Sequence, residues 1–223
     1  MEALKISDYR SCSLPDTLIV QRILSGEKEL FEILLRRYNQ RLFRAVRSYL
    51  KDSDDIEDAM QETYLHAYEK LYQFKGSAAF STWLVRIGIN EALLRVRKLK
   101  KSQALYKEGE GSALENNIQL PDSKQMNPEK QAINSEIRLL IEQAIDQLPE
   151  KYRAVYVLKE VEGMENSEIA LCLGLSDSNI KVRLHRAKNL LKEALYKRSA
   201  DTSIFEFGNS RCDRLVAYVM ERI

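Results

Sequence analysis

The stretch SEIALCLGLSDSNIKVRLHRAK, residues 167–188, decides the fold that the sequence predicts for its C-terminal part. Helical spacing puts Ile169 and the small Ala170 on one inward face of a short first helix. Gly174 follows, where a left-handed residue ends a helix, and Ser176 then suits the cap of a second helix. Two helices joined by a short turn that contains glycine form a helix-turn-helix motif.

The second helix of this motif has an apolar side and a basic side. Its apolar side is formed by Ile180, Leu184, Ala187 and Leu191. A helix-turn-helix places the first turns of its second helix against base edges in the major groove, where cations read guanine and Val packs on thymine. We therefore predict a duplex-DNA surface made of Ser178, Asn179, Lys181, Val182, Arg183, His185, Arg186 and Lys188. The alternative is a basic amphipathic helix whose cations are only solvated.

The composition of the 223-residue chain favours helices over strands and turns, because it contains only 4 prolines and 8 glycines. The net charge of +2 does not indicate whether the chain binds nucleic acid, so the distribution of charge along the chain has to be considered instead. No stretch rich in β-forming residues and no internal repeat is present. The predicted fold class is all-α.

The helical pattern is interrupted once, between residues 102 and 130, by a stretch rich in glycine, asparagine and acidic side chains. So long a structureless stretch is unusual inside one compact domain, and it indicates a flexible linker. We therefore predict two small helical domains, at 16–101 and 131–198, the second containing the helix-turn-helix. An N-terminal extension, 1–15, and a C-terminal extension, 199–223, flank them.

A helix predicted from residue 54 to about residue 72 has an acidic outer side with a leucine at its centre. The leucine is Leu65, and the polar members of this side are Asp55, Asp58, Gln61, Glu62 and Glu69. An apolar anchor with a carboxylate rim is typical of a docking surface for a basic partner. A solvated acidic face with one incidental exposed leucine is the equal alternative.

A second candidate surface combines a loop containing aromatic and glycine residues with a basic helix end. Its members are Phe74, Lys75, Ser77, Ala78, Trp83, Arg86, Asn90, Arg95, Arg97 and Lys98. Single-stranded DNA suits such a surface, because bases stack on aromatic rings while cations follow the backbone. For Trp83 a place in the core is the favoured alternative, since Phe80, Trp83 and Ile87 have helical spacing.

The remaining composition excludes several classes of function. The 3 cysteines are scattered and the 2 histidines lie far apart, so neither a disulfide framework nor a metal site is expected. No phosphate loop or nucleophile arrangement is present, so we predict no enzyme and no cofactor. The sequence contains no signal peptide and no membrane-length apolar run, so a cytoplasmic protein without membrane insertion is expected.

Several motifs together resemble the extracytoplasmic-function (ECF) group of sigma factors, in the sigma-70 family. DDIEDAMQET (54–63) and FSTWL (80–84) resemble the domain that binds core RNA polymerase and recognises the −10 element. LPEKYR (148–153), SEIA (167–170) and KVRLHRA (181–187) resemble the −35-recognition domain. The order of the motifs also agrees with this group, in which a linker replaces an intervening domain.

The resemblance implies a transcription initiation factor with defined partners. It implies that the acidic helix binds the β′ coiled coil of polymerase, that the β flap is a further contact, and that the 74–79 loop captures an unstacked −10 base of the promoter near Asn90. It also implies an anti-sigma factor as regulator. The chain departs from common family residues at Ser178, Asn179, Ile180 and Val182, which puts the −35 sequence preference in doubt.

Two other functions remain open at the level of sequence. A stand-alone helix-turn-helix regulator would bind duplex DNA without docking on polymerase. A helical adaptor would bind only proteins. Both share the predicted all-α architecture, so fold alone does not separate them from a sigma factor.

Overall fold

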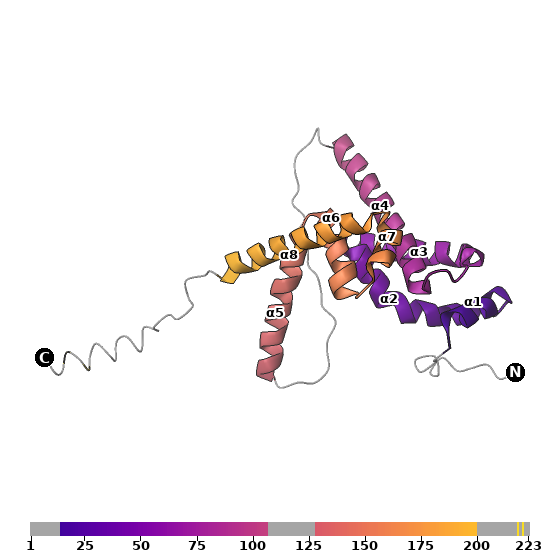
Figure 1. The fold of residues 1–223 in the computed structure, drawn as a ribbon, viewed down its shortest axis with the longest axis horizontal. Coiled ribbons are helices and arrows are strands. Elements are labelled where there is room, and N and C mark those ends of the chain that lie inside the picture. Colours follow the sequence, from indigo (N-terminus) through magenta and orange to yellow (C-terminus); the bar gives the residue numbers. More distant parts are fainter. Residues whose placement is uncertain (1–13, 107–127, 200–217, 219, 221–223) are drawn as a thin grey trace.

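The computed structural model describes residues 14–106, 128–199, 218 and 220, and over these residues it contains helices and no strand (Figure 1). The first half comprises α1 (Asp16–Leu24), η2 (Lys28–Leu30), α2 (Phe31–Arg47), α3 (Ser53–Glu69), η3 (Leu71–Gln73) and α4 (Phe80–Tyr106). The second half comprises α5 (Pro128–Asp146), α6 (Glu150–Tyr156), the π-helical turn η4 (Val157–Val161), α7 (Asn166–Leu173) and α8 (Asp177–Ser199). The all-α prediction is confirmed.

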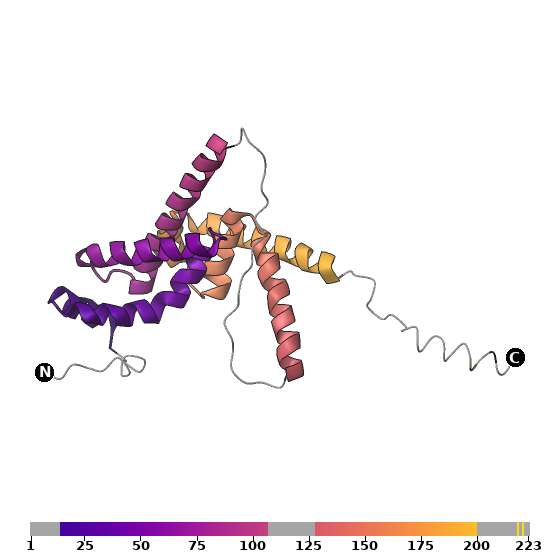
Figure 2. The same ribbon diagram turned by 180° about the vertical axis from the view of Figure 1, so that it is seen from behind.

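The first half is built on the apolar faces of α2, α3 and α4, which lie side by side in Figures 1 and 2. Leu34, Leu42 and Val46 repeat at helical spacing along α2 and are fully buried. α2 and α4 cross closely at Gly88, where an added Cβ would lie 2.4 Å from Leu42 Cδ1. This close crossing fixes the position of α4, which carries most of the second candidate surface.

Helix α3 begins one residue earlier than its sequence suggests. A helix that starts at residue 54 would be capped by Ser53, but Asp52 takes that role, because its carboxylate accepts hydrogen bonds from the backbone N–H groups of Asp54 and Asp55 at 3.0 and 3.1 Å. Asp and Ser cap helices about equally well, so the sequence alone does not choose between neighbours. The acidic first turn still lies at the positive end of the helix dipole.

The helix-turn-helix has the predicted geometry. Gly174 ends α7 in the left-handed conformation, at a φ of 63°. Ser176 Oγ accepts a hydrogen bond from the Asn179 backbone N–H at 3.3 Å and so caps α8. A capping box that the sequence analysis did not anticipate starts α7, with Glu168 Oε2 accepting from the Glu165 backbone N–H at 2.9 Å. The end of α7 and the start of α8 are therefore both fixed by local interactions, and these two ends determine how the helices cross.

Apolar residues recur at helical spacing along α5, but the face that they form is only partly covered. Ala144 and Leu148 at its C-terminal end are buried, whereas Ile137, Leu140 and Ile141 are 50%, 42% and 39% exposed. Figures 1 and 2 show the reason, since α5 projects from the body and only its C-terminal end meets other helices. Periodicity identifies an apolar face but does not say what covers it.

The two halves contact each other directly. Ala45 of α2 and Val85 and Ile89 of α4 share one buried cluster with side chains of the second half. The second-half members of that cluster are Val155, Leu158, Met164, Ile169, Cys172 and Ile180. Most of the predicted linker, at 107–127, lies outside the described residues, and α4 and α5 extend into its two ends. The extensions 1–13 and, apart from 218 and 220, 200–223 also lie outside them.

Candidate nucleic-acid interface

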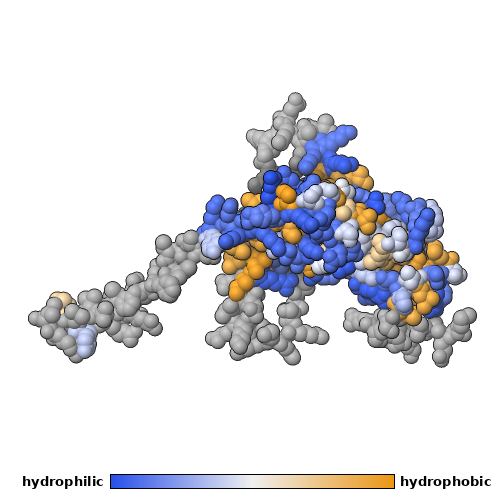
Figure 3. Space-filling model, in the orientation of Figure 1, coloured by the Kyte–Doolittle hydropathy of each residue, from blue (hydrophilic) through white to orange (hydrophobic). Residues whose placement is uncertain are grey.

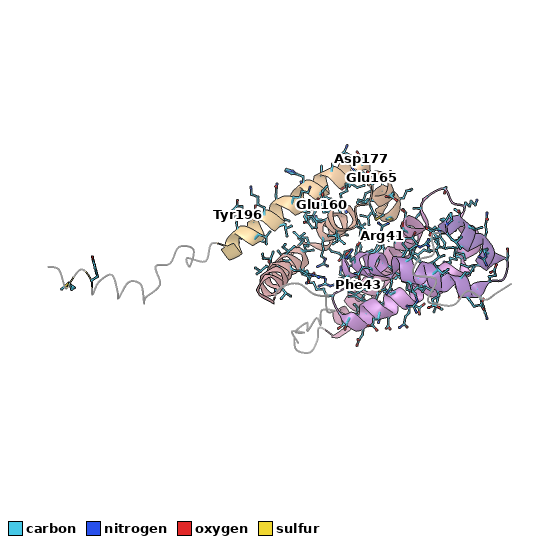
Figure 4. The ribbon with its side chains drawn as sticks, turned by 90° about the horizontal axis from the view of Figure 1, so that it is seen from below. Arg41, Phe43, Glu160, Glu165, Asp177 and Tyr196 are labelled. Atoms are coloured by element: carbon cyan, nitrogen blue, oxygen red, sulfur yellow. The ribbon has the colours of Figure 1, made fainter. Side chains whose placement is uncertain are left out.

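The outer face of α8 presents the residues predicted to read duplex DNA. Ile180 and Ala187 are fully buried, so the opposite side of the helix faces outward. Val182 is 50% exposed, which leaves its methyl groups available to a base edge. Figure 4 shows this helix running from Asp177 at one end toward Tyr196 at the other. The remaining predicted readers are all exposed or, for Arg183, half-buried: Ser178, Asn179, Lys181, Arg183, His185, Arg186 and Lys188.

Short contacts within the helix orient several of these side chains. Lys181 pairs with Asp177 at 2.7 Å, and Arg183 Nε donates to Asn179 Oδ1 at 2.8 Å. Exposed pairs of this kind contribute little to stability, so they can exchange for contacts with DNA. Asn179, one of the residues that departs from the family pattern, therefore holds a guanidinium on this face.

Arg186 lies over α6, where its Nη1 donates to the phenol oxygen of Tyr152 at 3.3 Å. This hydrogen bond lowers the pKa of the Tyr152 phenol from its usual value. Lys188 instead pairs with Glu160 at 2.9 Å and so points toward η4. Of the two cations, Arg186 is held less tightly, because its hydrogen bond is a long one to a neutral hydroxyl whereas Lys188 forms an ion pair.

The loop before α4 is held by an aromatic cluster. Phe74 packs against Phe80 and Trp83, with ring centroids 5.4 and 5.6 Å apart. Trp83 is half-buried and contacts the first-half core, in agreement with the core interpretation. The loop residues Lys75 and Ser77 are exposed, and Ala78, like Phe74 at the start of the loop, is half-buried. The aromatic rings thus position the loop, and its exposed residues are free to meet a nucleotide.

The basic end of α4 divides into two groups. Arg86, Asn90, Arg97 and Lys98 are exposed, as a DNA surface requires. Arg95 is half-buried and paired, with Nε 2.6 Å from Asp55 Oδ1 and Nη2 2.7 Å from Asp58 Oδ2. These hydrogen bonds, that to Asp55 above all, raise the pKa of Arg95. One predicted DNA contact therefore ties α4 to two predicted contacts of the acidic helix.

The acidic face of α3 keeps its apolar centre exposed. Leu65 is 60% exposed, and Gln61 and Glu62 beside it are exposed as well. A groove of about 350 Å³ runs between α3 and α4 next to Glu62. It is lined in part by Leu94 and Leu99, which are 46% and 38% exposed and which the sequence analysis missed because they lie within the basic run. The face thus has the exposed Leu65 on α3 and, beside Glu62, a separate groove whose lining mixes apolar and charged side chains.

Cys172 is buried where the two halves meet, and its Sγ lies 3.4 Å from the backbone oxygen of Thr82. Burial raises the pKa of its thiol to about 12. Thiolates, and not thiols, react with disulfides and alkylating reagents. Cys172 is therefore an inert packing residue as long as the halves stay in contact.

We predict that a variant with Cys12→Ser and Cys212→Ser reacts very slowly with iodoacetamide when folded. At pH 8 a thiol pKa raised from 9.0 to about 12 lowers the thiolate fraction by about 1,000-fold. The rate is measured by mass spectrometry and compared with the same protein in urea. A folded rate within tenfold of the unfolded rate would contradict the buried position.

Family models match both halves of the chain. The model described as Sigma-70 region 2 matches residues 34–102, and the model described as Sigma-70, region 4 matches residues 138–191. The RNA polymerase sigma-H factor of Pseudomonas aeruginosa is 30% identical over 184 residues, which cover 81% of this chain and 93% of that protein. The chain belongs to the sigma-70 family. The ECF RNA polymerase sigma-E factor of Escherichia coli K12, 30% identical over 186 residues (80% of this chain, 93% of that protein), confirms the ECF group.

Solved structures agree on the fold of this sigma factor. The sigma factor RpoE of Bartonella quintana, in complex with the anti-sigma factor NepR, matches with a TM-score of 0.60 at 22% identity, over 77% of this chain and 98% of that chain. CnrH in complex with the cytosolic domain of CnrY matches with a TM-score of 0.55 at 24% identity, over 84% and 99%. Both are ECF-type helical arrangements, so they support the architecture and carry no residue-level assignment.

A sigma factor is a specificity subunit of transcription initiation and not an enzyme, so both sequence predictions are confirmed. Among the described residues no group of three or more His, Cys, Asp or Glu side chains is arranged to hold a metal ion. Within the same part of the chain, no helix is both long and apolar enough to cross a membrane.

Proposed function

We propose that this sigma factor uses three separate surfaces: α3 for core polymerase, α8 for the −35 duplex, and the 74–79 loop with α4 for the melted −10 strand. The observation that carries this proposal is the exposure of Leu65, Val182 and Arg186 on elements whose opposite faces are buried. An apolar anchor with a polar rim, or an exposed arginine on a rigid helix, is the arrangement found at the centre of interfaces. The three surfaces lie on different elements, so one chain can hold polymerase and DNA at the same time.

The α8 surface suits duplex DNA because cations and a methyl-bearing side chain stand together on it. Arg186 and Lys181 supply donors for guanine, and Val182 supplies an apolar contact for a thymine methyl. Arg183, Ser178 and Asn179 lie at the edges of this face, where phosphates follow the groove. Three of the four departures from common family residues, Ser178, Asn179 and Val182, lie on this face, so the −35 sequence that it prefers should differ from that of the relatives.

The loop and α4 suit a single strand. The exposed Lys75 and Ser77 stand beside the Phe74–Trp83 aromatic cluster, and Arg86 and Asn90 follow on the exposed side of α4. Proteins that bind single-stranded DNA usually place cations along its phosphate backbone, beside a surface or pocket that takes an unstacked base. Arg97 and Lys98 extend the basic track along the end of α4, which projects from the body in Figure 1.

The β flap of polymerase has a matching surface on the second half. A pocket of about 520 Å³ lies between α6 and α8 and is lined by Tyr156, Leu191, Leu195 and Tyr196, with Lys188 and Lys192 at its edge. Figure 3 shows apolar side chains gathered between α8 and α5 in this part of the molecule. An apolar helix or loop tip from polymerase fits such a pocket, in the way that amphipathic helices fill grooves.

An anti-sigma factor is the regulator that we propose for this chain. Two proteins that share its fold have been solved with partners: RpoE in complex with the anti-sigma factor NepR, and CnrH in complex with the cytosolic domain of CnrY. The groove between α3 and α4 gives such a partner a surface that overlaps the polymerase site. Because polymerase and promoter DNA are its proposed targets, we place its site of action in the cytoplasm.

A band-shift assay with a promoter duplex separates this function from a stand-alone regulator. The expected result is a stable specific complex only when factor and core polymerase are added together. A specific complex of equal affinity with the factor alone would support the stand-alone regulator instead. Binding to core without any DNA complex would support the protein-only adaptor.

A further inference from the structure

Helix α5 carries an apolar stripe of which only one end is covered. Ile137, Leu140 and Ile141 lie on one side of the helix at helical spacing, and all three are exposed. The same side continues into Ala144 and Leu148, which are buried. Figures 1 and 2 show no described helix beside the projecting part of α5. A helix normally buries such a stripe against another element, so the exposed part of this one lacks its cover among the described residues.

Rotation of α5 cannot supply the missing cover, because ion pairs hold the opposite side of the helix. Asp146 lies opposite the apolar stripe and forms two parallel bonds to Arg47, at 2.7 and 2.6 Å. Paired bonds between a guanidinium and a carboxylate fix orientation as well as adding energy. A rotation that buried Leu140 would break these bonds and expose Ala144. The cover must therefore come to α5 from elsewhere.

The C-terminal extension contains a second apolar stripe, in residues 211–223. At ~100° per residue its apolar members fall within one arc of a helix: Cys212, Leu215, Val216, Val219, Met220 and Ile223. The charged residues of the same segment fall outside that arc: Arg211, Asp213, Arg214, Glu221 and Arg222. The structure describes Tyr218 and Met220 of this segment, both helical, and Met220 is 64% exposed. This is the pattern of a surface helix that packs one side on a neighbour.

The segment depends on such a neighbour for its own stability. A helix shorter than about 12–15 residues is marginal in water by itself, so 211–223 needs an apolar surface to stay helical. A segment tethered to its binding face is present there at an effective concentration of about millimolar. That concentration favours the chain's own segment over a second copy or a separate protein as the occupant of the α5 stripe.

The connecting residues are long enough for this contact. α8 ends at Ser199 and also contacts α5. Its 23 residues are ~35 Å long, whereas residues 200–210 can span ~40 Å when extended. The connection can therefore return from Ser199 to any point at which the two helices meet. As a helix, 211–223 is ~20 Å long and matches the ~16 Å between Ile137 and Leu148 along α5.

We propose that residues 211–223 fold back as an amphipathic helix whose apolar side docks on the exposed stripe of α5. The contact adds a helix to the second half of the chain and buries Ile137, Leu140 and Ile141. None of the residues assigned to polymerase or DNA belongs to it, so this inference does not rest on the proposed function. It identifies the C-terminal extension as part of the fold of the second half.

Crosslinking between the two apolar sides tests the contact. Leu140→Cys places a thiol on the α5 stripe, and the native Cys212 supplies the second thiol, in a protein that also carries Cys12→Ser. A short bismaleimide is expected to join them within one chain, as measured by mass spectrometry of peptides. Cys172 is buried and does not compete for the reagent. Ile137→Cys and Ile141→Cys are treated in the same way, because they sample other positions along the stripe.

Leu139→Cys is the matched control for these variants. Leu139 and Leu140 are 40% and 42% exposed, but helical spacing puts Leu139 on the side of α5 away from the stripe. At least one thiol on the stripe is expected to crosslink to Cys212 about tenfold faster than a thiol at position 139, since docking raises the local concentration only on its own side.

Val219→Asp tests the contact from the side of the extension. Amide hydrogen exchange of residues 137–143 is the measurement, and it is expected to become about tenfold faster, because an uncovered helix opens more often. Ala217→Asp adds the same carboxylate outside the apolar arc and is expected to leave the exchange unchanged. Unchanged exchange in α2 establishes that both variants keep the rest of the fold.

Several outcomes would overturn the inference. One is that no thiol on the stripe crosslinks faster than the thiol at position 139, which would leave the stripe uncovered in the purified protein and open to a separate partner. Another is that crosslinks join only two different chains, which would assign the stripe to a second copy. A third is that Val219→Asp changes neither crosslinking nor exchange. None of these measurements involves polymerase or DNA, so the proposed function stands or falls separately.

Discussion

Replacement of Leu65 by aspartate is expected to weaken binding to core RNA polymerase by about 30-fold or more, because a central anchor of an interface contributes ~2 kcal/mol or more. Leu65 is 60% exposed on α3, and none of its surroundings requires an apolar side chain for folding. A carboxylate at this point adds a desolvation cost to the lost apolar contact. The affinity is measured by fluorescence anisotropy of labelled factor titrated with core polymerase.

The control for this variant is Leu24→Asp. Leu24 ends α1 and is 53% exposed, so the chemical change and the exposure are matched while the α3 face stays intact. Leu24→Asp is expected to bind core within twofold of the unchanged protein. Equal affinity of the Leu65→Asp variant would show that Leu65 is an incidental exposed leucine and would remove α3 from the polymerase interface.

Arg186→Ala is expected to reduce use of a −35 element by about 10- to 100-fold, since a good bidentate contact to guanine contributes ~1–3 kcal/mol of discrimination. The Arg186 side chain is exposed, and its hydrogen bond to Tyr152 is a long one to a neutral hydroxyl. The fold should therefore tolerate the change. Affinity for core polymerase is expected to stay the same, because we propose that it depends on α3 and on the pocket beside α6.

Two companion variants isolate the role of Arg186. Tyr152→Phe removes the hydroxyl partner and leaves the guanidinium, and it is expected to retain −35 use. Lys197→Ala removes a cation farther along α8 and controls for a general loss of charge attraction. Competition between promoters with intact and altered −35 elements is the measurement. If Arg186→Ala and Lys197→Ala weaken all promoters equally, Arg186 contacts phosphates and does not read bases.

The sequence predicted best the features that are fixed by neighbouring residues. Gly174 and Ser176 determine the turn of the helix-turn-helix through their own backbone preferences, and the structure places both as expected. The burial of Ile180 and Ala187 follows directly from helical period, which also orients the DNA surface. In this motif the backbone preferences of the residues and the helical period both predict the same structure, so the sequence leaves few alternative folds open.

Features that depend on distant residues were not predictable. Glu162 is more than 100 positions from Arg41 and Arg44 in sequence, and nothing in either stretch indicates the pairing. The ion pairs of Arg95 with Asp55 and Asp58 could not be predicted either, because a run of basic residues in the sequence indicates only nucleic-acid binding. Helix α5 shows a different limit: its apolar residues have the helical period, but the fold covers only the C-terminal part of the face that they form.

The central claim is that this chain directs polymerase to promoters through two DNA contacts. It is tested most directly by run-off transcription with core polymerase on a library of random upstream sequences, with transcript starts mapped by sequencing. The account predicts two enriched motifs, one near −35 and one near −10, and predicts that Arg186→Ala relaxes only the upstream one. Transcripts that require the factor but show no upstream motif, or the absence of any factor-dependent transcript, would contradict it.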